Sequence, residues 1–200
     1  MVLLVRIPAE PQLDRENLML LKKENSCLLL IDVQEKLAPH VADFEALIER
    51  CQWVIRLAAK LGVPQLISEQ YPSGLGVTLG PLHALMPDNQ AIEKVHFSCL
   101  REPAFKERLQ QLNRKQMVLI GIETHVCVLQ TAMDLIEADY EVFVVVDAVS
   151  SRHEIDYKYG LKRMKQAGAV LLTAEMVFFE WVEHAGTPEF KALSKLFLTR

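Results

Sequence analysis

Residues 118–128 read VLIGIETHVCV, an apolar run that passes through Gly121 into a stretch with helical character. The apolar run predicts a buried strand, and Cys127 follows it at the head of the predicted helix. A thiol at a helix N-terminus lies near unpaired N–H groups, which should lower its pKa and favour the thiolate. Cys127 is therefore a candidate nucleophile.

The alternation of short apolar runs and amphipathic stretches continues through most of the chain. Strands are predicted near residues 26–32, 64–68, 91–95, 116–121, 141–146 and 169–173. Strands that alternate with helices are typical of a parallel sheet covered on both faces. We therefore expect an α/β fold, with a three-layer, Rossmann-like sheet of six parallel strands in the order 3-2-1-4-5-6 and helices on both faces.

Several helices carry start and stop signals. Asp43 is predicted to cap the first helix, and Gly62 is predicted to end it. Ser151 and Glu154 have the spacing of a capping box, which predicts a later helix that stops at Gly168. Two tail helices are expected at residues 174–184 and 188–197.

Length and composition predict one globular domain. The chain has 200 residues, of which half are hydrophobic and about a quarter charged. We assign residues 25–200 to one globular domain and residues 1–24 to an N-terminal arm, which matches no part of the alternating pattern. This arm and the apolar residues Phe178, Phe179 and Trp181 exceed what a small domain is expected to bury. They predict a homo-oligomer in which the arm packs on a neighbouring subunit.

Charge and cysteine usage limit the partners and the compartment. The formal net charge is −4 and there is no run of Lys or Arg, so nucleic acid and anionic membranes are not expected partners. No stretch approaches the roughly 20 apolar residues of a membrane span, and the first residues do not form a convincing signal peptide. The four cysteines lack metal-type spacing. A reducing cytoplasm fits this pattern.

Three ionisable residues are predicted at the ends of strands. In an open parallel sheet, ligands bind beyond the carboxyl ends of the strands, where the winding direction reverses. Asp32 ends the first predicted strand and Cys127 follows the fourth, so the expected strand order makes them neighbours. Lys94 ends the third strand and would reach inward past the second. Each residue alone has an ordinary explanation as a turn residue, a surface charge or packing, but together they predict one site.

The segments around these residues resemble a known family. DVQ at residues 32–34, KVHFS at 94–98 and GIETHVCV at 121–128 look like the three motif blocks of the isochorismatase-like cysteine hydrolases. This superfamily includes nicotinamidases and N-carbamoylsarcosine amidases. EQYP at 69–72 and VDAVSSR at 146–152 look most like its isochorismatase-domain-containing branch. The resemblance extends from about residue 25 to 185.

The resemblance implies a catalytic triad of Asp32, Lys94 and Cys127. Asp32 would accept the thiol proton, and Lys94 would hold the carboxylate and the thiolate in place. Cys127 would attack a small amide or related acyl substrate and form a thioester that water hydrolyses. The family also implies a cis peptide between Ile122 and Glu123, with the N–H groups of Glu123 and Cys127 as an oxyanion hole.

Other residues follow from the same interpretation. Gln34, Tyr71 and Phe97 are predicted to contact the substrate. Nicotinamidases of this family bind a metal through an Asp-x-His pair and further histidines after the second strand, whereas residues 68–72 here read SEQYP. A site without imidazole binds transition metals weakly, so neither a metal nor another cofactor is expected.

Two other classes of function remain open at this point. A reactive cysteine is also typical of a thiol redox protein, although no CxxC motif or nearby resolving cysteine is evident in the sequence. A binding or scaffold protein could retain the fold without turnover. Hydrolysis of the vinyl ether of isochorismate is disfavoured, because that chemistry has no role for a nucleophilic cysteine.

Overall fold

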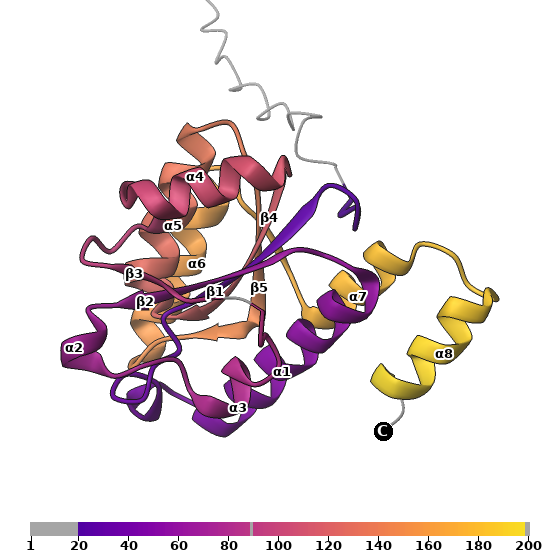
Figure 1. The fold of residues 1–200 in the computed structure, drawn as a ribbon, viewed down its shortest axis with the longest axis horizontal. Helices are drawn as coiled ribbons and strands as arrows, with labels where there is room; N and C mark the ends of the chain where they lie inside the picture. Colours follow the sequence, from indigo (N-terminus) through magenta and orange to yellow (C-terminus); the bar gives the residue numbers. More distant parts are fainter. Residues whose placement is uncertain (1–19, 89, 199–200) are drawn as a thin grey trace, which may run out of the picture.

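The predicted sheet is present in the structure, a computed structural model that describes residues 20–88 and 90–198 (Figure 1). The strands are β1 (Ser26–Ile31), β2 (Gln65–Gln70), β3 (Ile92–Lys94), β4 (Gln116–Ile122), β5 (Glu141–Ser150) and β6 (Val170–Leu172). They form one six-stranded sheet in the order β3-β2-β1-β4-β5-β6, and every neighbouring pair is parallel. The fold class and the strand order predicted from the sequence are confirmed.

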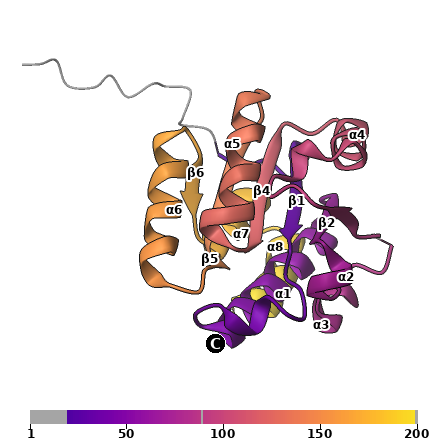
Figure 2. The ribbon, with the colours of Figure 1, turned by 90° about the vertical axis from the view of Figure 1, so that its left-hand side faces the viewer.

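Helices cover both faces of this sheet (Figures 1 and 2). One face carries α1 (Phe44–Leu61) and α7 (Ala174–Val182), with α8 (Pro188–Phe197) packed against them; the other carries α4 (Pro103–Leu112), α5 (Leu129–Glu137) and α6 (Glu154–Gln166). Two short helices, α2 (Pro72–Leu75) and α3 (Gly80–His83), lie in the connection between β2 and β3. Among the described residues, no helix has the length and apolar character needed to cross a membrane.

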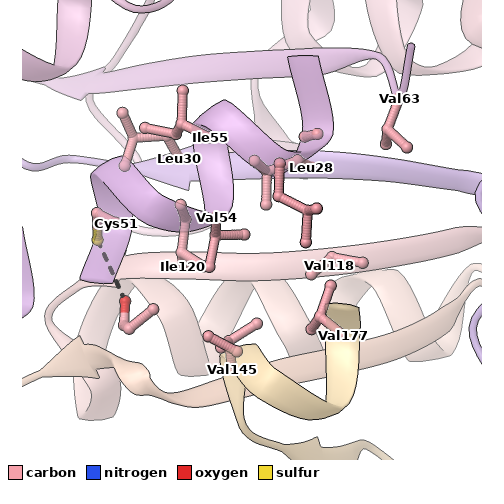
Figure 3. Packing of buried hydrophobic residues seen from close by; sticks show 14 of the residues in the cluster. Leu28, Leu30, Cys51, Val54, Ile55, Val63, Val118, Ile120, Val145 and Val177 are labelled. Carbon is pink, nitrogen blue, oxygen red and sulfur yellow. Dashed lines mark hydrogen bonds between the residues drawn. The ribbon is translucent and has the colours of Figure 1, made fainter. Parts of the chain in front are cut away.

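The apolar strands supply two cores because side chains alternate along a strand. Leu28 and Leu30 of β1 pack toward Val54 and Ile55 of α1 (Figure 3). Leu29 points the other way and belongs to the core beneath α4, α5 and α6. All six residues of β1 are buried, as expected for a central strand with helices on both sides. This continuous apolar run places the end of β1, and therefore Asp32, in the middle of the sheet.

The ends of two helices test the predicted signals. Gly62 ends α1 with a φ of 69°, as predicted, and Asp43 precedes α1 but makes no capping hydrogen bond through its side chain. The capping box at Ser151 is wrong, because His153 precedes α6 and no side chain caps that helix. The hydroxyl of Ser151 instead lies 3.0 Å from Nδ1 of His125, a residue distant in sequence.

The tail is better buried than the sequence predicted. Phe178 and Trp181 have no exposed surface, and the indole nitrogen of Trp181 donates a hydrogen bond of 2.9 Å to Ser26 Oγ. The expectation that both exceed what one domain buries is therefore wrong, and only Phe179 is half exposed. Leu21, which was assigned to the N-terminal arm, is fully buried in the core. Residues 1–19 lie outside the described residues, so the contact of the arm with another subunit stays a prediction.

Candidate active site

The structure brings the three predicted catalytic residues together at the carboxyl edge of the sheet. Asp32 follows β1, Lys94 is the last residue of β3, and Cys127 lies in a single π-helical turn, Thr124–Val128, after β4. Lys94 Nζ is 2.7 Å from Asp32 Oδ2, and both side chains are almost completely buried. The charges of both residues act on the Cys127 thiol. The topological argument from the sequence thus located the right edge of the sheet.

Tight local geometry positions Asp32. Its φ is 52°, and its amide donates to the Ser68 carbonyl at 3.2 Å where β1 ends. Its Oδ1 accepts a hydrogen bond of 2.7 Å from Ser68 Oγ. Gly121 of β4 has a φ of 117°, and a Cβ there would collide with the carbonyl oxygen of Ile31. The glycine therefore lets β4 approach β1 just before the two strands deliver Cys127 and Asp32.

Several hydrogen-bond acceptors surround the Lys94 ammonium. Besides the Asp32 carboxylate, Nζ donates to Gln70 Oε1 at 2.6 Å and to the carbonyls of His96 and Phe97 at 3.3 and 3.1 Å. Burial lowers the pKa of Lys94, but the charge of Asp32 and the other partners outweigh burial and raise the pKa above its ordinary value. Lys94 therefore stays a cation inside the site.

The predicted fall in the pKa of Cys127 is wrong. Burial of the thiol, and then the negative charge of Asp32, raise the pKa of Cys127, while Lys94 lowers it by less. Cys127 also lies within the π-helical turn and not at the first residue of an α-helix, so the helix field expected from the sequence is not the dominant effect. The resting site consequently holds a neutral thiol beside a buried ion pair.

Acidity does not distinguish Cys127 from the other cysteines, but exposure does. Burial raises the pKa of Cys27 to about 12 and that of Cys99 to about 11, and it also raises the pKa of Cys51. These three side chains are fully buried, whereas Cys127 retains 5% of its surface. Cys127 is therefore the least buried of the four cysteines.

Glu123 links the nucleophile's turn to the end of β5. The peptide between Ile122 and Glu123 is cis, as the resemblance implies. The Glu123 carboxylate accepts hydrogen bonds from the backbone N–H and the Nε of Arg152, at 3.1 and 3.0 Å. A cavity of about 510 Å³ adjoins this pair and is lined by Leu37, His40, Glu123, Arg152 and His153. The Glu123–Arg152 pair thus borders a space large enough for a small molecule.

The three predicted substrate contacts differ in their placement. Gln34 is fully buried, and its amide is committed to backbone groups of Gln70 and Gly76 at 2.6 to 3.0 Å. The Gln34 amide therefore ties these two backbone segments together, and both of its polar atoms are already hydrogen-bonded within the protein. Tyr71 and Phe97 are about half exposed and belong to segments bonded directly to Lys94, through Tyr71 N and Phe97 O. The structure therefore places these two aromatic residues beside the triad and uses the Gln34 amide to bind backbone groups, while contact of any of the three with a substrate stays a prediction.

The last two residues of β2, Glu69 and Gln70, do not fit a nicotinamidase-type metal. Glu69 Oε1 accepts the Thr78 N–H at 2.6 Å, and Gln70 Oε1 accepts the Lys94 ammonium. Both polar side chains are thus already bound to hydrogen-bond donors, and no imidazole lies in this stretch. Within residues 20–88 and 90–198, no cluster of three or more His, Cys, Asp or Glu side chains could hold a metal.

Gln70 is a site residue that the sequence analysis did not single out. It is the last residue of β2, pairs in register with Lys94, and places Oε1 3.9 Å from Cys127 Sγ. The available signal was its position, since it is a polar residue at the carboxyl end of the strand beside β1. What the sequence could not show is that its side chain turns toward the thiol.

Comparison with known proteins agrees with this arrangement. The isochorismatase domain matches residues 26–176, a range that contains Asp32, Lys94 and Cys127. Isochorismatase domain-containing protein 2A from Mus musculus is 41% identical over 175 residues, which are 86% of this chain and 82% of that protein. A Caenorhabditis elegans structure described as the MAR1 ribonuclease is 38% identical, has a TM-score of 0.84, and is matched over 90% of this chain and 93% of its own.

A second solved structure is similar over almost its full length. The YcaC protein of Escherichia coli, described as an octameric hydrolase of unknown specificity, is 26% identical with a TM-score of 0.80. The match covers 90% of this chain and 98% of that one. The domain match, the sequence relatives and the shared fold agree over the region that holds the site. The chain belongs to the isochorismatase-like hydrolase family.

Proposed function

We propose that the protein is a metal-independent cysteine hydrolase that acts on a small amide or related acyl substrate. The observation that supports this most strongly is the buried Asp32–Lys94 ion pair beside the least buried of the four thiols, Cys127. A buried ion pair of this kind is costly to desolvate, and such pairs persist most readily where function needs them. Membership of a hydrolase family supports the reaction class.

The first half-reaction begins from the neutral thiol. As Cys127 Sγ attacks the carbonyl carbon, its proton passes to Asp32, so the S–C bond forms while the substrate oxygen becomes an oxyanion. The N–H groups of Glu123 and Cys127 are proposed to stabilise that oxyanion. Asp32 then returns the proton to the leaving nitrogen, the C–N bond breaks, and the acyl group remains on sulfur as a thioester.

The second half-reaction uses the same groups in reverse. Water attacks the thioester carbon and forms a C–O bond while Asp32 accepts one of its protons; the S–C bond then breaks, and the proton returns to the Cys127 sulfur as the acid product leaves. The net charge of Asp32, Lys94 and Cys127 is zero both before and after the proton moves from sulfur to carboxylate. The buried site therefore needs no change of net charge when the nucleophile forms, which matters because burial penalises uncompensated charge.

Tyr71 and Phe97 are proposed to contact the apolar part of the substrate. Their side chains are half exposed, and each belongs to a segment bonded to Lys94. Aromatic side chains supply a large apolar contact area and have few rotatable bonds to order. Gln34 is proposed to act indirectly, by holding the Gln70 backbone and the Gly76 carbonyl.

RNA cleavage is a second candidate, since a relative 38% identical to this chain is described as a ribonuclease. The formal net charge of −4 disfavours it, because binding of the phosphate backbone depends on Lys and Arg. Incubation of the wild type and Cys127→Ser with labelled RNA separates the two proposals. Cleavage of RNA that Cys127→Ser abolishes, together with no acyl adduct from amides, would favour the ribonuclease.

Intact-protein mass spectrometry with a pooled library of small amides tests the hydrolase proposal. The wild type is expected to accumulate an acyl adduct on Cys127. Cys51→Ser serves as the matched control and should form the same adduct, since Cys51 lies in the core beneath α1 and its thiol donates to the Ala148 carbonyl. Oxidation of Cys127 without any acyl adduct would instead favour the thiol redox alternative. Neither modification, in a folded protein, would favour a binding or scaffold role.

Chelation is expected to leave the hydrolase activity unchanged, because Glu69 and Gln70 are committed to hydrogen-bond donors and residues 68–72 contain no histidine. The measurement is turnover before and after treatment with a strong chelator, followed by addition of zinc or iron. Loss of activity on chelation and its recovery with either metal would contradict metal independence.

A homo-oligomer is also proposed, because the YcaC relative is described as octameric and Phe179 and Met176 remain about half exposed on α7. Light scattering at micromolar concentration should give a mass that is a multiple of the 22.7 kDa chain. A mass of one chain would contradict this proposal. All four cysteines are free thiols, which supports a reducing compartment such as the cytoplasm.

A further inference from the structure

We propose that Gln70 is a fourth member of the catalytic group, whose amide oxygen accepts both the Cys127 S–H and a Lys94 N–H and keeps the thiol protonated until substrate binds. This inference rests on the proposed cysteine hydrolase function. It adds a residue that touches the reacting sulfur, with Oε1 3.9 Å from Cys127 Sγ.

The orientation of the Gln70 amide follows from its partners. One end of the amide lies 2.9 Å from the carbonyl oxygen of Val95, which can only accept a hydrogen bond, so this end is the Nε2 donor. The other end lies 2.6 Å from Lys94 Nζ, which can only donate, so it is the Oε1 acceptor. The atom that faces the Cys127 thiol is therefore an acceptor.

The backbone of Gln70 is held as firmly as its side chain. Its N–H donates to Gln34 Oε1 at 2.7 Å, and its carbonyl accepts from Gln34 Nε2 at 3.0 Å. Gln70 also pairs in register with Lys94 across β2 and β3, and it is largely buried. A residue fixed at both ends cannot turn away from the thiol without breaking several buried hydrogen bonds.

The hydrogen-bond acceptors around Lys94 Nζ determine whether the ammonium can also bind the Cys127 sulfur. Nζ has three N–H groups, but Asp32, Gln70 and two backbone carbonyls already compete for them. The resting ammonium therefore has no spare N–H for Cys127, and the acceptors beside the thiol are Gln70 Oε1 and the Asp32 carboxylate. A carbonyl acceptor stabilises a neutral S–H and repels a thiolate, so Gln70 disfavours ionisation before substrate arrives.

The same arrangement assists the reaction once Asp32 takes the proton. A neutral carboxylic acid attracts the ammonium less than a carboxylate does, which releases an N–H of Lys94 toward the new thiolate. Gln70 Oε1 continues to hold Lys94 Nζ while Asp32 is neutral. Gln70 thus holds the Lys94 ammonium in place during the step in which Asp32 is protonated and loses its negative charge.

Alkylation of Cys127 by iodoacetamide tests this role without any substrate. Gln70→Met removes the strong acceptor at similar length, and it should speed alkylation about tenfold, the equivalent of one pKa unit. Gln70→Glu places a negative charge beside the sulfur and should slow alkylation by about the same factor. Rates are followed across neutral and alkaline pH by mass spectrometry of the Cys127 peptide.

Gln110→Glu is the matched control, since it makes the same chemical change on the exposed surface of α4 and should leave the rate unchanged. Opposite shifts in the two Gln70 variants support the assignment, because simple loosening of the site would move both rates in one direction. Equal rates, or shifts of the same sign, would overturn it. If Gln70→Glu does not fold, Gln70→Met decides alone: faster alkylation supports the role, and an unchanged or slower rate contradicts it.

The alkylation test of Gln70 and the acyl-adduct test of the hydrolase proposal can fail independently of each other. Failure to detect an acyl adduct on wild-type Cys127 would overturn the hydrolase function, whatever the Gln70 variants do. An acyl adduct in the wild type with unshifted alkylation in both Gln70 variants would leave the hydrolase intact and remove Gln70 from the catalytic group.

Discussion

Cys127→Ser is expected to lower kcat by about a thousandfold or more while leaving the fold intact. A serine hydroxyl is far less acidic than a thiol, and Asp32 as a carboxylate is too weak a base to activate it. The side chain is nearly isosteric, and Gln70 Oε1, 3.9 Å from the sulfur, accepts from a hydroxyl as readily as from a thiol. Stability should therefore change little.

Steady-state turnover of an amide found in the adduct screen, together with thermal unfolding, is the measurement for Cys127→Ser. Cys51→Ser is the control, because its thiol makes a hydrogen bond of 3.5 Å to the Ala148 carbonyl in the core beneath α1 and takes no part in the site. It should keep most of the turnover. Retention of a tenth or more of wild-type kcat by Cys127→Ser would leave covalent catalysis by sulfur without support.

The strand order and the edge that carries the site could be predicted because few local signals determine them. The apolar run of β1 is too continuous for a strand exposed on one face, so it had to be central and parallel. Once β1 and β4 are neighbours, Asp32 and Cys127 must emerge at the same edge. Gly121 strengthens that prediction, because only a glycine permits the close approach of the two strands there.

The depth of burial could not be predicted in the same way. The sequence placed Cys127 near a helix start, which correctly predicted its position but gave the wrong direction for its pKa. The pKa depends on how completely the surrounding loops exclude water and on how close Asp32 lies, and both follow from tertiary structure. The same limit applies to Phe178 and Trp181, whose burial depends on the packing of α7 and α8.

Two glutamines show why the polar residues of the site were assigned less well. Gln34 and Gln70 both follow or end buried strands, so their positions in the sequence are equivalent. Gln34 turns toward the Gly76 carbonyl because the connection after β2 folds back over it, while Gln70 turns toward Lys94. The path of the connection after β2 therefore determines that Gln34 binds backbone groups and that Gln70 faces the thiol. The periodicity of the sequence does not predict that path.

Lys94→Met is expected to remove turnover and to destabilise the fold by about 3 to 5 kcal/mol. Methionine has similar length but leaves the Asp32 carboxylate buried without its counter-ion. That carboxylate has no exposed surface, and the hydrogen bond from Ser68 would not replace the lost positive charge. Substituting both residues, as in Asp32→Asn with Lys94→Met, removes the uncompensated charge and should recover most of the lost stability while turnover stays absent.

The pH dependence of unfolding gives this prediction a second readout. The pKa of Lys94 is raised in the folded protein, so the stability that its charge contributes is present below the unfolded value, about 10.4, and is lost as the pH rises through the higher folded value. The wild type should therefore lose stability above about pH 10.4 through this group, whereas Lys94→Met should lack that loss. The difference in unfolding free energy between the two proteins should shrink in the same range.

Urea unfolding of the wild type, both single variants and the double variant completes a double-mutant cycle for the pair. The expected result is a large favourable coupling energy between Asp32 and Lys94, because each single substitution leaves the other charged group buried without its counter-ion. A Lys94→Met protein as stable as the wild type, with the double variant no more stable than the single one, would mean that the ion pair contributes nothing to folding. The buried charges of Asp32 and Lys94 would then have to be compensated by Ser68, Gln70 and the backbone carbonyls alone.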